Sequence, residues 1–128
     1  MPQDHRLFTS LTVEENLQVG THWAAPGSWS LGRVYELYPY LKEKRRAHPG
    51  DLTPEEHQAA AIGRALIANP RILLLDSPSH AGPVDRLAKE DLALVVATPD
   101  LPATTCRIHR LVDGRSTTTR PEVNCCPR

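Results

Sequence analysis

The run "RILLLD", residues 71–76, constrains the fold of this chain most strongly, because its apolar side chains do not alternate with polar ones. A strand without alternation predicts burial on both faces, which favours a parallel sheet. A second apolar run, "LALVVAT" at 92–98, supplies a partner strand. The segment from Ser77 to Asp91 is just long enough for a right-handed crossover, and "VDRLAKED" within it predicts a short helix. The expected fold class is therefore α/β.

Two helices are expected early in the chain. In "SLTVEENLQVG", Thr12 and Glu15 have the spacing of a capping box, and the apolar face that follows is Val13, Leu17 and Gly20. In "SLGRVYELYPYLKEKRR", apolar residues recur at helical spacing at positions 31, 34, 37 or 38, and 41. Pro39 must kink or divide this second helix, and the basic "KEKRR" is expected to close it as a solvated end.

A third helix is expected directly before the apolar run. Thr53 is its N-cap, Pro54 its first residue, and Glu56 completes a second capping box. Asn69 and Pro70 stop the helix. The residues expected to face inward are Ala59, Ile62, Ala65 and Leu66.

The C-terminal part predicts a hairpin, because "RIHRLV" and "RSTTT" flank an Asp113–Gly114 turn. We expect one domain over 1–128, with a helical part at 9–69, a small α/β part at 70–120 and a loose tail at 121–128.

The composition excludes several functions. The chain has 15 basic and 15 acidic residues and 5% aromatic residues, which argues against nucleic-acid binding. No long apolar run or N-terminal signal region is present, so a cytoplasmic protein is expected. The three cysteines form no CxxC pair and the six histidines show no HxxxH spacing, which indicates free thiols and no zinc site.

The ordered series "LFTSLTVEENL", "RVYELYPYLKEKRR", "AIGRALIANPRILLLD" and "RLVDGR" resembles the ATP-binding cassette (ABC) transporter ATPases. Within that family it is most similar to the subunit that energises branched-chain amino-acid uptake. The resemblance covers nearly the whole chain, from Pro2 to about Arg115. It implies a partial P-loop NTPase fold, in which a helical subdomain precedes a small parallel sheet and a hairpin.

The resemblance also assigns family motifs to positions in this chain. "MPQD" resembles the Q-loop, which implies that Gln3 senses Mg²⁺ and the attacking water. "LTPEEHQ" stands at the LSGGQ-type signature, where Thr53 keeps a hydroxyl near the γ-phosphate. "RILLLD" matches the Walker B strand, with Asp76 at the Mg²⁺-associated position. The implied ligands are ATP and Mg²⁺. The implied partners are a membrane permease and a second ATP-binding subunit at the inner face of the membrane.

Several positions depart from the family pattern. The 128 residues contain no G-x-x-x-x-G-K-[ST] loop, which in the family lies upstream of the Q-loop, so the chain resembles an N-terminally truncated, degenerate member. Pro54 and Glu55 replace small residues at the signature, Ser77 stands in place of the catalytic glutamate and Pro99 in place of the switch histidine. A neutral serine cannot accept the proton of the attacking water, so we expect no catalytic residue and no ATP hydrolysis by this chain alone.

Three functional hypotheses follow from the sequence. The chain is an ABC subunit or fragment in amino-acid import, or a non-catalytic remnant that acts only by interaction. A hydrolase using "DSPSH" is disfavoured, because this stretch lacks a G-x-S-x-G elbow.

Overall fold

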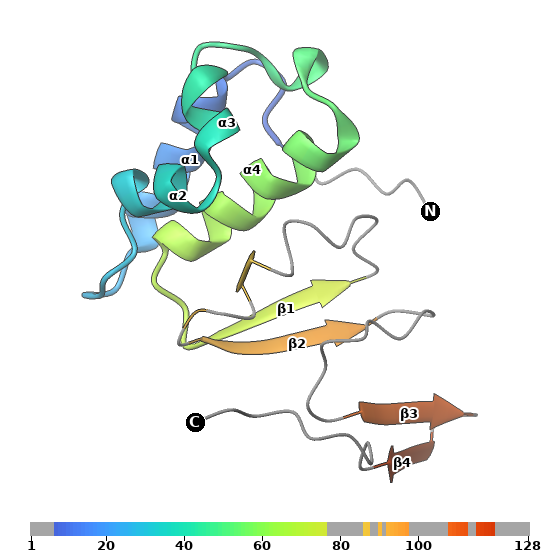
Figure 1. The fold of residues 1–128 in the computed structure, drawn as a ribbon. Coiled ribbons are helices and arrows are strands. Elements are labelled where there is room, and N and C mark those ends of the chain that lie inside the picture. Colours follow the sequence, from blue (N-terminus) through green and yellow to red (C-terminus); the bar gives the residue numbers. More distant parts are fainter. Residues whose placement is uncertain are drawn as a thin grey trace. The chain divides into compact units, whose positions relative to one another are not determined.

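The computed structural model describes residues 7–76, 86–87, 90 and 92–97, together with the backbone of the strands at 108–112 and 115–119. Contacts divide the chain into two compact units, Met1–Ala97 and Thr98–Arg128 (Figure 1). The first unit contains all the described helices and a pair of parallel strands. The second contains a hairpin. The division of one domain into parts ending at residues 69 and 120 stays a prediction.

The three helices predicted before β1 are present, the second of them in two pieces. They are α1 (Val13–Val19), which continues into the 3-10 turn η1 (Gly20–Trp23), then α2 (Leu31–Leu37), α3 (Pro39–Glu43), the 3-10 turn η2 (Pro49–Asp51) and α4 (Pro54–Ile67). Pro39 divides the second predicted helix into α2 and α3, as expected from its missing N–H. The basic run "KEKRR" was expected to close this helix, but α3 already ends at Glu43 and the run continues beyond it.

The hydrophobic core lies where the helices meet. Its fully buried side chains come from every α-helix: Val13, Leu17, Val34, Tyr38, Leu41, Ala59, Ala60 and Leu66. The inward face predicted for α4 is confirmed for Ala59, Ile62 and Leu66, whereas Ala65 is half-buried. Two glycines permit close packing: Gly20 lies against the backbone of Arg64, and Gly63 lies against Val34 and Leu17.

The predicted parallel pair is confirmed, but its predicted burial is wrong. Strand β1 (Ile72–Asp76) pairs in parallel with β2 (Ala93–Ala97), in the register Ile72↔Ala93 to Asp76↔Ala97. Leu73 is 6% exposed, whereas Ile72 is 58% and Leu74 72% exposed. Burial therefore alternates along β1 although its apolar sequence does not. The physical reason is that one side of this two-stranded pair packs against the core and the other side faces solvent.

Of the predicted helix between β1 and β2, Arg86, Leu87 and Glu90 are described; the first two are helical, whereas Glu90 lies in a bend. Leu87 is buried, and the guanidinium of Arg86 donates to the carbonyl of Leu37 over 2.7 Å. Residues 77–85, which include Ser77, lie outside the described part of the chain.

The hairpin of the second unit has the predicted register. Strand β3 (Ile108–Val112) is antiparallel to β4 (Arg115–Thr119), and Val112 pairs with Arg115. This register leaves two residues for the turn, as predicted, although Asp113, Gly114 and the tail at 121–128 are outside the described residues. Among the helices that the structure describes, none has the length and apolar character needed to cross a membrane.

Candidate functional site

The start of α4 is closed by its own side chains. The Thr53 hydroxyl accepts a hydrogen bond from the amide of Glu56 over 3.3 Å, and the amide of Thr53 donates to the Glu56 carboxylate over 2.8 Å. Together these bonds form the capping box that the sequence predicts. Thr53 is therefore placed as an N-cap, with its hydroxyl already engaged inside the helix.

The Glu56 carboxylate also binds a lysine from the basic run after α3. The ammonium of Lys44 lies 2.8 Å from the same carboxylate oxygen that accepts from Thr53. Burial raises the pKa of Glu56, but the hydrogen bonds from Lys44 and Thr53 outweigh it and hold the pKa below its ordinary value of 4.5. The ionised form of Glu56 is thus the form that the fold favours.

This arrangement leaves little of α4's N-terminus for an anion. A helix start binds phosphate through its free amides. Pro54 has no amide hydrogen, and the amide of Glu56 is used by Thr53, so at most the amide of Glu55 remains in the first turn. The side chain of Glu55 adds an exposed negative charge beside that amide. The first turn of α4 is therefore electrostatically unfavourable for phosphate.

We expect Glu56 to make the free energy of unfolding depend on pH. Because its pKa is lowered in the folded state, its contribution to stability is present above about pH 4.5 and is lost as the pH falls through the folded pKa. Glu56→Gln is expected to lower the free energy of unfolding by about 1 kcal/mol at neutral pH. This difference from the wild type should shrink below about pH 4.5. Urea unfolding of both proteins, at neutral and acidic pH, measures it.

Glu55→Gln is the matched control for that experiment, because it removes the same charge from an exposed side chain in the same turn. An equal loss in both variants, or a difference independent of pH, would contradict the role of Glu56.

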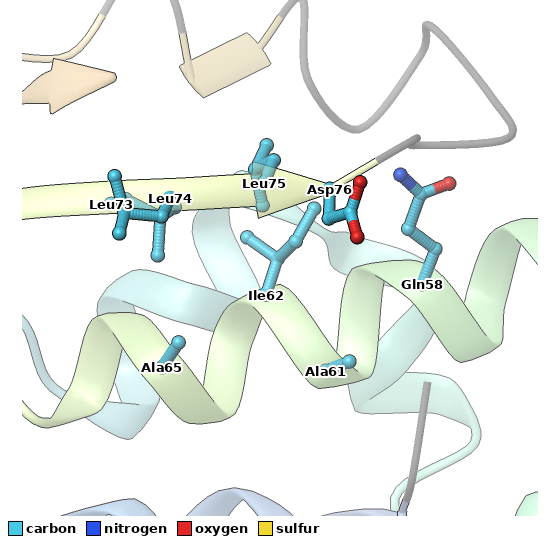
Figure 2. Close-up of a pocket in the computed structure, with 8 residues that line it drawn as sticks. All are labelled: Gln58, Ala61, Ile62, Ala65, Leu73, Leu74, Leu75 and Asp76. Carbon is cyan, nitrogen blue, oxygen red and sulfur yellow. The ribbon is translucent and has the colours of Figure 1, made fainter. Parts of the chain in front are cut away.

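Asp76 lies at the C-terminal end of β1, at the rim of an open cavity of ≈ 220 Å³ between β1 and α4 (Figure 2). The cavity is lined by Gln58, Ala61, Ile62 and Ala65 of α4 and by Leu73, Leu74, Leu75 and Asp76 of β1. In Figure 2 the Gln58 amide and the Asp76 carboxylate lie at the same end of the cavity. The walls are apolar and this one end is polar.

A metal ion at Asp76 would need oxygen ligands beyond this carboxylate. Within the described residues, no three His, Cys, Asp or Glu side chains gather where they could hold a metal ion. A single carboxylate is characteristic of Mg²⁺ that shares its ligands with substrate phosphates and water. Asp76 has no such group of companions among the described residues, and its assignment to Mg²⁺ stays a prediction.

Of the three predicted site residues, the structure describes two, and it places them in different surroundings. Gln3 lies outside the described residues, Thr53 caps α4, and Asp76 lines the cavity with Gln58. The cavity lining includes Asp76 but not Thr53. Sequence reasoning missed Gln58, which is 1% exposed. Its spacing from Ile62 and Ala65 was the available signal, because residues four and seven positions apart share a helix face.

The fold and this site define the class of protein. A helical part followed by a parallel strand pair, whose first strand ends in Asp76, is part of the ABC ATPase fold. The structure aligns with the dimeric, post-hydrolysis ATP-binding cassette MJ0796 bound to ADP and Pi, with a TM-score of 0.73 and 26% identity over 92% of this chain. A second cassette, MJ1267 of an ABC transporter, shares the fold with a TM-score of 0.68 at 17% identity. These alignments cover 61% and 58% of the two solved chains.

The sequence relatives make the chain a homologue of ABC transporter ATP-binding proteins. It is 42% identical over 81 residues to the high-affinity branched-chain amino acid transport ATP-binding protein BraG of Pseudomonas aeruginosa, a match over 62% of this chain. It is 44% identical over 81 residues to the molybdenum import ATP-binding protein ModC of Paramagnetospirillum magneticum. It is 38% identical over 80 residues to the aliphatic sulfonates import ATP-binding protein SsuB of Bacillus subtilis.

The chain spans only part of these relatives. The matches cover 35% of BraG, 22% of ModC and 31% of SsuB. No protein-family model matches the chain.

Proposed function

We propose that this chain serves as an ATP-binding subunit, or a part of one, in an ABC transporter for amino-acid import. The similarity to BraG supports the amino-acid substrate. ModC and SsuB are comparably similar and are named for molybdenum and sulfonates, and a transport assay with an amino acid, molybdate and a sulfonate distinguishes the three substrates.

In this proposal the chain works at the inner face of the membrane. Its helical part docks on a membrane permease, and ATP is held jointly with a second ATP-binding subunit. Gln3, Thr53 and Asp76 face the nucleotide, with Asp76 contributing to Mg²⁺ coordination together with the phosphates. The similarity to a cassette solved as a dimer with ADP and Pi supports this arrangement.

The start of α4, whose free backbone groups are bonded by its own side chains, is the observation that argues most strongly against ATP hydrolysis by this chain alone. In the described structure Thr53 and Glu56 satisfy each other, and Lys44 neutralises the Glu56 carboxylate. Ser77 and Pro99 replace the residues that the family uses to activate water and to contact the γ-phosphate. We therefore expect that this chain does not hydrolyse ATP on its own.

Phosphate release from Mg²⁺-ATP tests this expectation. The purified chain alone is expected to release phosphate no faster than buffer. A competent cassette partner is then added, and its own rate of phosphate release is measured separately. A rate for the mixture above that of the partner alone would support a subunit role. Robust phosphate release by the chain alone would refute the expectation that hydrolysis requires a partner subunit.

A second candidate function is interaction without nucleotide. The closed α4 N-terminus and the charge of Glu55 favour it, because both weaken phosphate binding. In this case, calorimetric titration with Mg²⁺-ATP would show no binding, while binding to a permease persists. An affinity in the micromolar range for the isolated chain would eliminate this candidate.

A further inference from the structure

The crossover between β1 and β2 contacts α2 near both of its ends. At the C-terminal end, the guanidinium of Arg86 donates to the carbonyl of Leu37 over 2.7 Å. In the first turn of the helix, the guanidinium of Arg33 lies 2.6 Å from the carboxylate of Glu90. The two contacts join residues that are 49 and 57 positions apart in the sequence. Two separate side-chain contacts therefore tie α2 to the crossover.

The helix break at Pro39 explains why Arg86 finds an acceptor on α2. In an unbroken helix, the carbonyl of Leu37 would accept from the amide of Leu41, four residues further on. The amide of Leu41 instead donates to the carbonyl of Tyr38 over 3.0 Å. Carbonyls at the end of a helix need another donor, and for Leu37 the guanidinium of Arg86 supplies it.

The guanidinium of Arg33 is oriented by a tryptophan as well as by Glu90. It lies 4.7 Å from the centre of the Trp29 ring, in a cation–π arrangement. The Asn69 side chain in turn fixes the backbone of Trp29, because it accepts from the Trp29 amide over 2.7 Å. The side chains of Arg33 and Glu90 are 39% and 24% exposed. The ion pair is therefore well oriented and still open to screening by salt.

Few buried side chains hold the strand pair and the crossover to the helices. Among the described residues of this part, Leu73 of β1 and Leu87 of the crossover are buried, and none in β2 is. A layer with few buried contacts opens locally at a lower free-energy cost than the whole fold. The contacts of Arg33 and Arg86 are thus a substantial part of what resists such an opening.

We propose that Trp29, Arg33, Arg86 and Glu90 form a latch that keeps the crossover and the strand pair on the helical part. When the latch opens, the contacts between the crossover and α2 break, while α1 and α4 stay packed through their fully buried side chains. Because β1 and α4 are the two walls of the cavity at Asp76, this opening widens the cavity. The latch thereby controls access to it.

Native-state hydrogen exchange in urea, on the chain without nucleotide or partner, tests the latch. The amides of β1 and β2 are expected to exchange through an opening that depends less on urea than that of the α4 amides, because a partial opening exposes less surface. Arg33→Gln, Glu90→Gln and Arg86→Gln should each speed exchange in the strands about fivefold. Failure of the proposed transporter function would leave these results unchanged.

Salt and a charge exchange identify the ion pair as the cause. Raising NaCl from about 0.05 to 1 M should speed strand exchange in the wild type, because the pair is screened, and should affect Arg33→Gln less. Arg33→Glu places two acids together, and adding Glu90→Arg should slow the exchange again by restoring an ion pair. Arg46→Gln removes an exposed cation in the turn after α3 and is the matched control, with unchanged exchange in the strands.

The proposal is overturned if β1 and β2 exchange with the same urea dependence as α4, because the strands then open only when the whole unit unfolds. It is also overturned if Arg33→Gln and Glu90→Gln leave the strand amides at the wild-type rate, or if Arg46→Gln speeds them equally. Circular dichroism verifies that each variant is folded.

Discussion

Gly20→Ala is expected to lower the free energy of unfolding by about 3 kcal/mol, the upper end of the cost of overpacking. The reason is space rather than backbone conformation. Gly20 has φ −61 and ψ −25, which any L-residue can adopt. A methyl group there would overlap the carbonyl oxygen of Arg64. That oxygen belongs to the backbone of α4, so it cannot move aside without disturbing the helix.

Urea unfolding followed by circular dichroism measures this loss. Gly32→Ala in α2 is the matched control, because the nearest atom to its added methyl group is the Ser30 hydroxyl at 3.8 Å. That variant should gain up to about 1 kcal/mol from alanine's better helix propensity. A Gly20→Ala protein that unfolds at the wild-type urea concentration would show that α1 and α4 are less closely packed than described.

Leu17→Ala is the second large effect, with an expected loss of about 3 kcal/mol from lost burial and the cavity left behind. Leu17 is fully buried on α1, and its Cδ2 would lie 2.9 Å from a methyl group added at Gly63 of α4. Gly63→Ala should therefore be tolerated better when Leu17 is alanine. The expected coupling between the two changes is about 1 kcal/mol, measured in a double-mutant cycle.

Strict additivity of Leu17→Ala and Gly63→Ala would contradict this coupling. Val34 lies on the other side of the same position, with its Cγ1 at 2.7 Å from the added methyl group. Part of the crowding at Gly63 therefore remains in the double variant, which is why full compensation is not expected.

Local signals predicted the helices well. Each of these signals depends on only a few neighbouring residues. The structure contains the capping boxes at Thr12 and Thr53 and the break at Pro39. The parallel pairing of β1 with β2 was also predictable, because the crossover length and the two apolar runs allow few alternatives.

Features that depend on tertiary surroundings were not predictable in the same way. An unbroken apolar sequence in β1 does not reveal whether one or both of its faces are covered, and the exposure of Leu74 shows that one is not. In the candidate site, Asp76 was singled out by the resemblance of its strand to the Walker B strand of the family, and its role there stays a prediction. The burial of Gln58 beside it was not predicted, because its spacing from Ile62 places it on the inward face while its polar side chain favours the surface.

The turn after α4 links two distant parts of the chain. Asn69 adopts a left-handed backbone, with φ 55, and its side-chain oxygen accepts from the amide of Trp29 over 2.7 Å. Its side-chain nitrogen donates to the carbonyls of Trp29 and Ile67, each over 3.2 Å. Because these bonds close a loop of 40 residues, we expect them to form after the contacts within each helix, which close much shorter loops. During refolding, hydrogen exchange at the Trp29 amide is therefore expected to slow later than exchange within the helices.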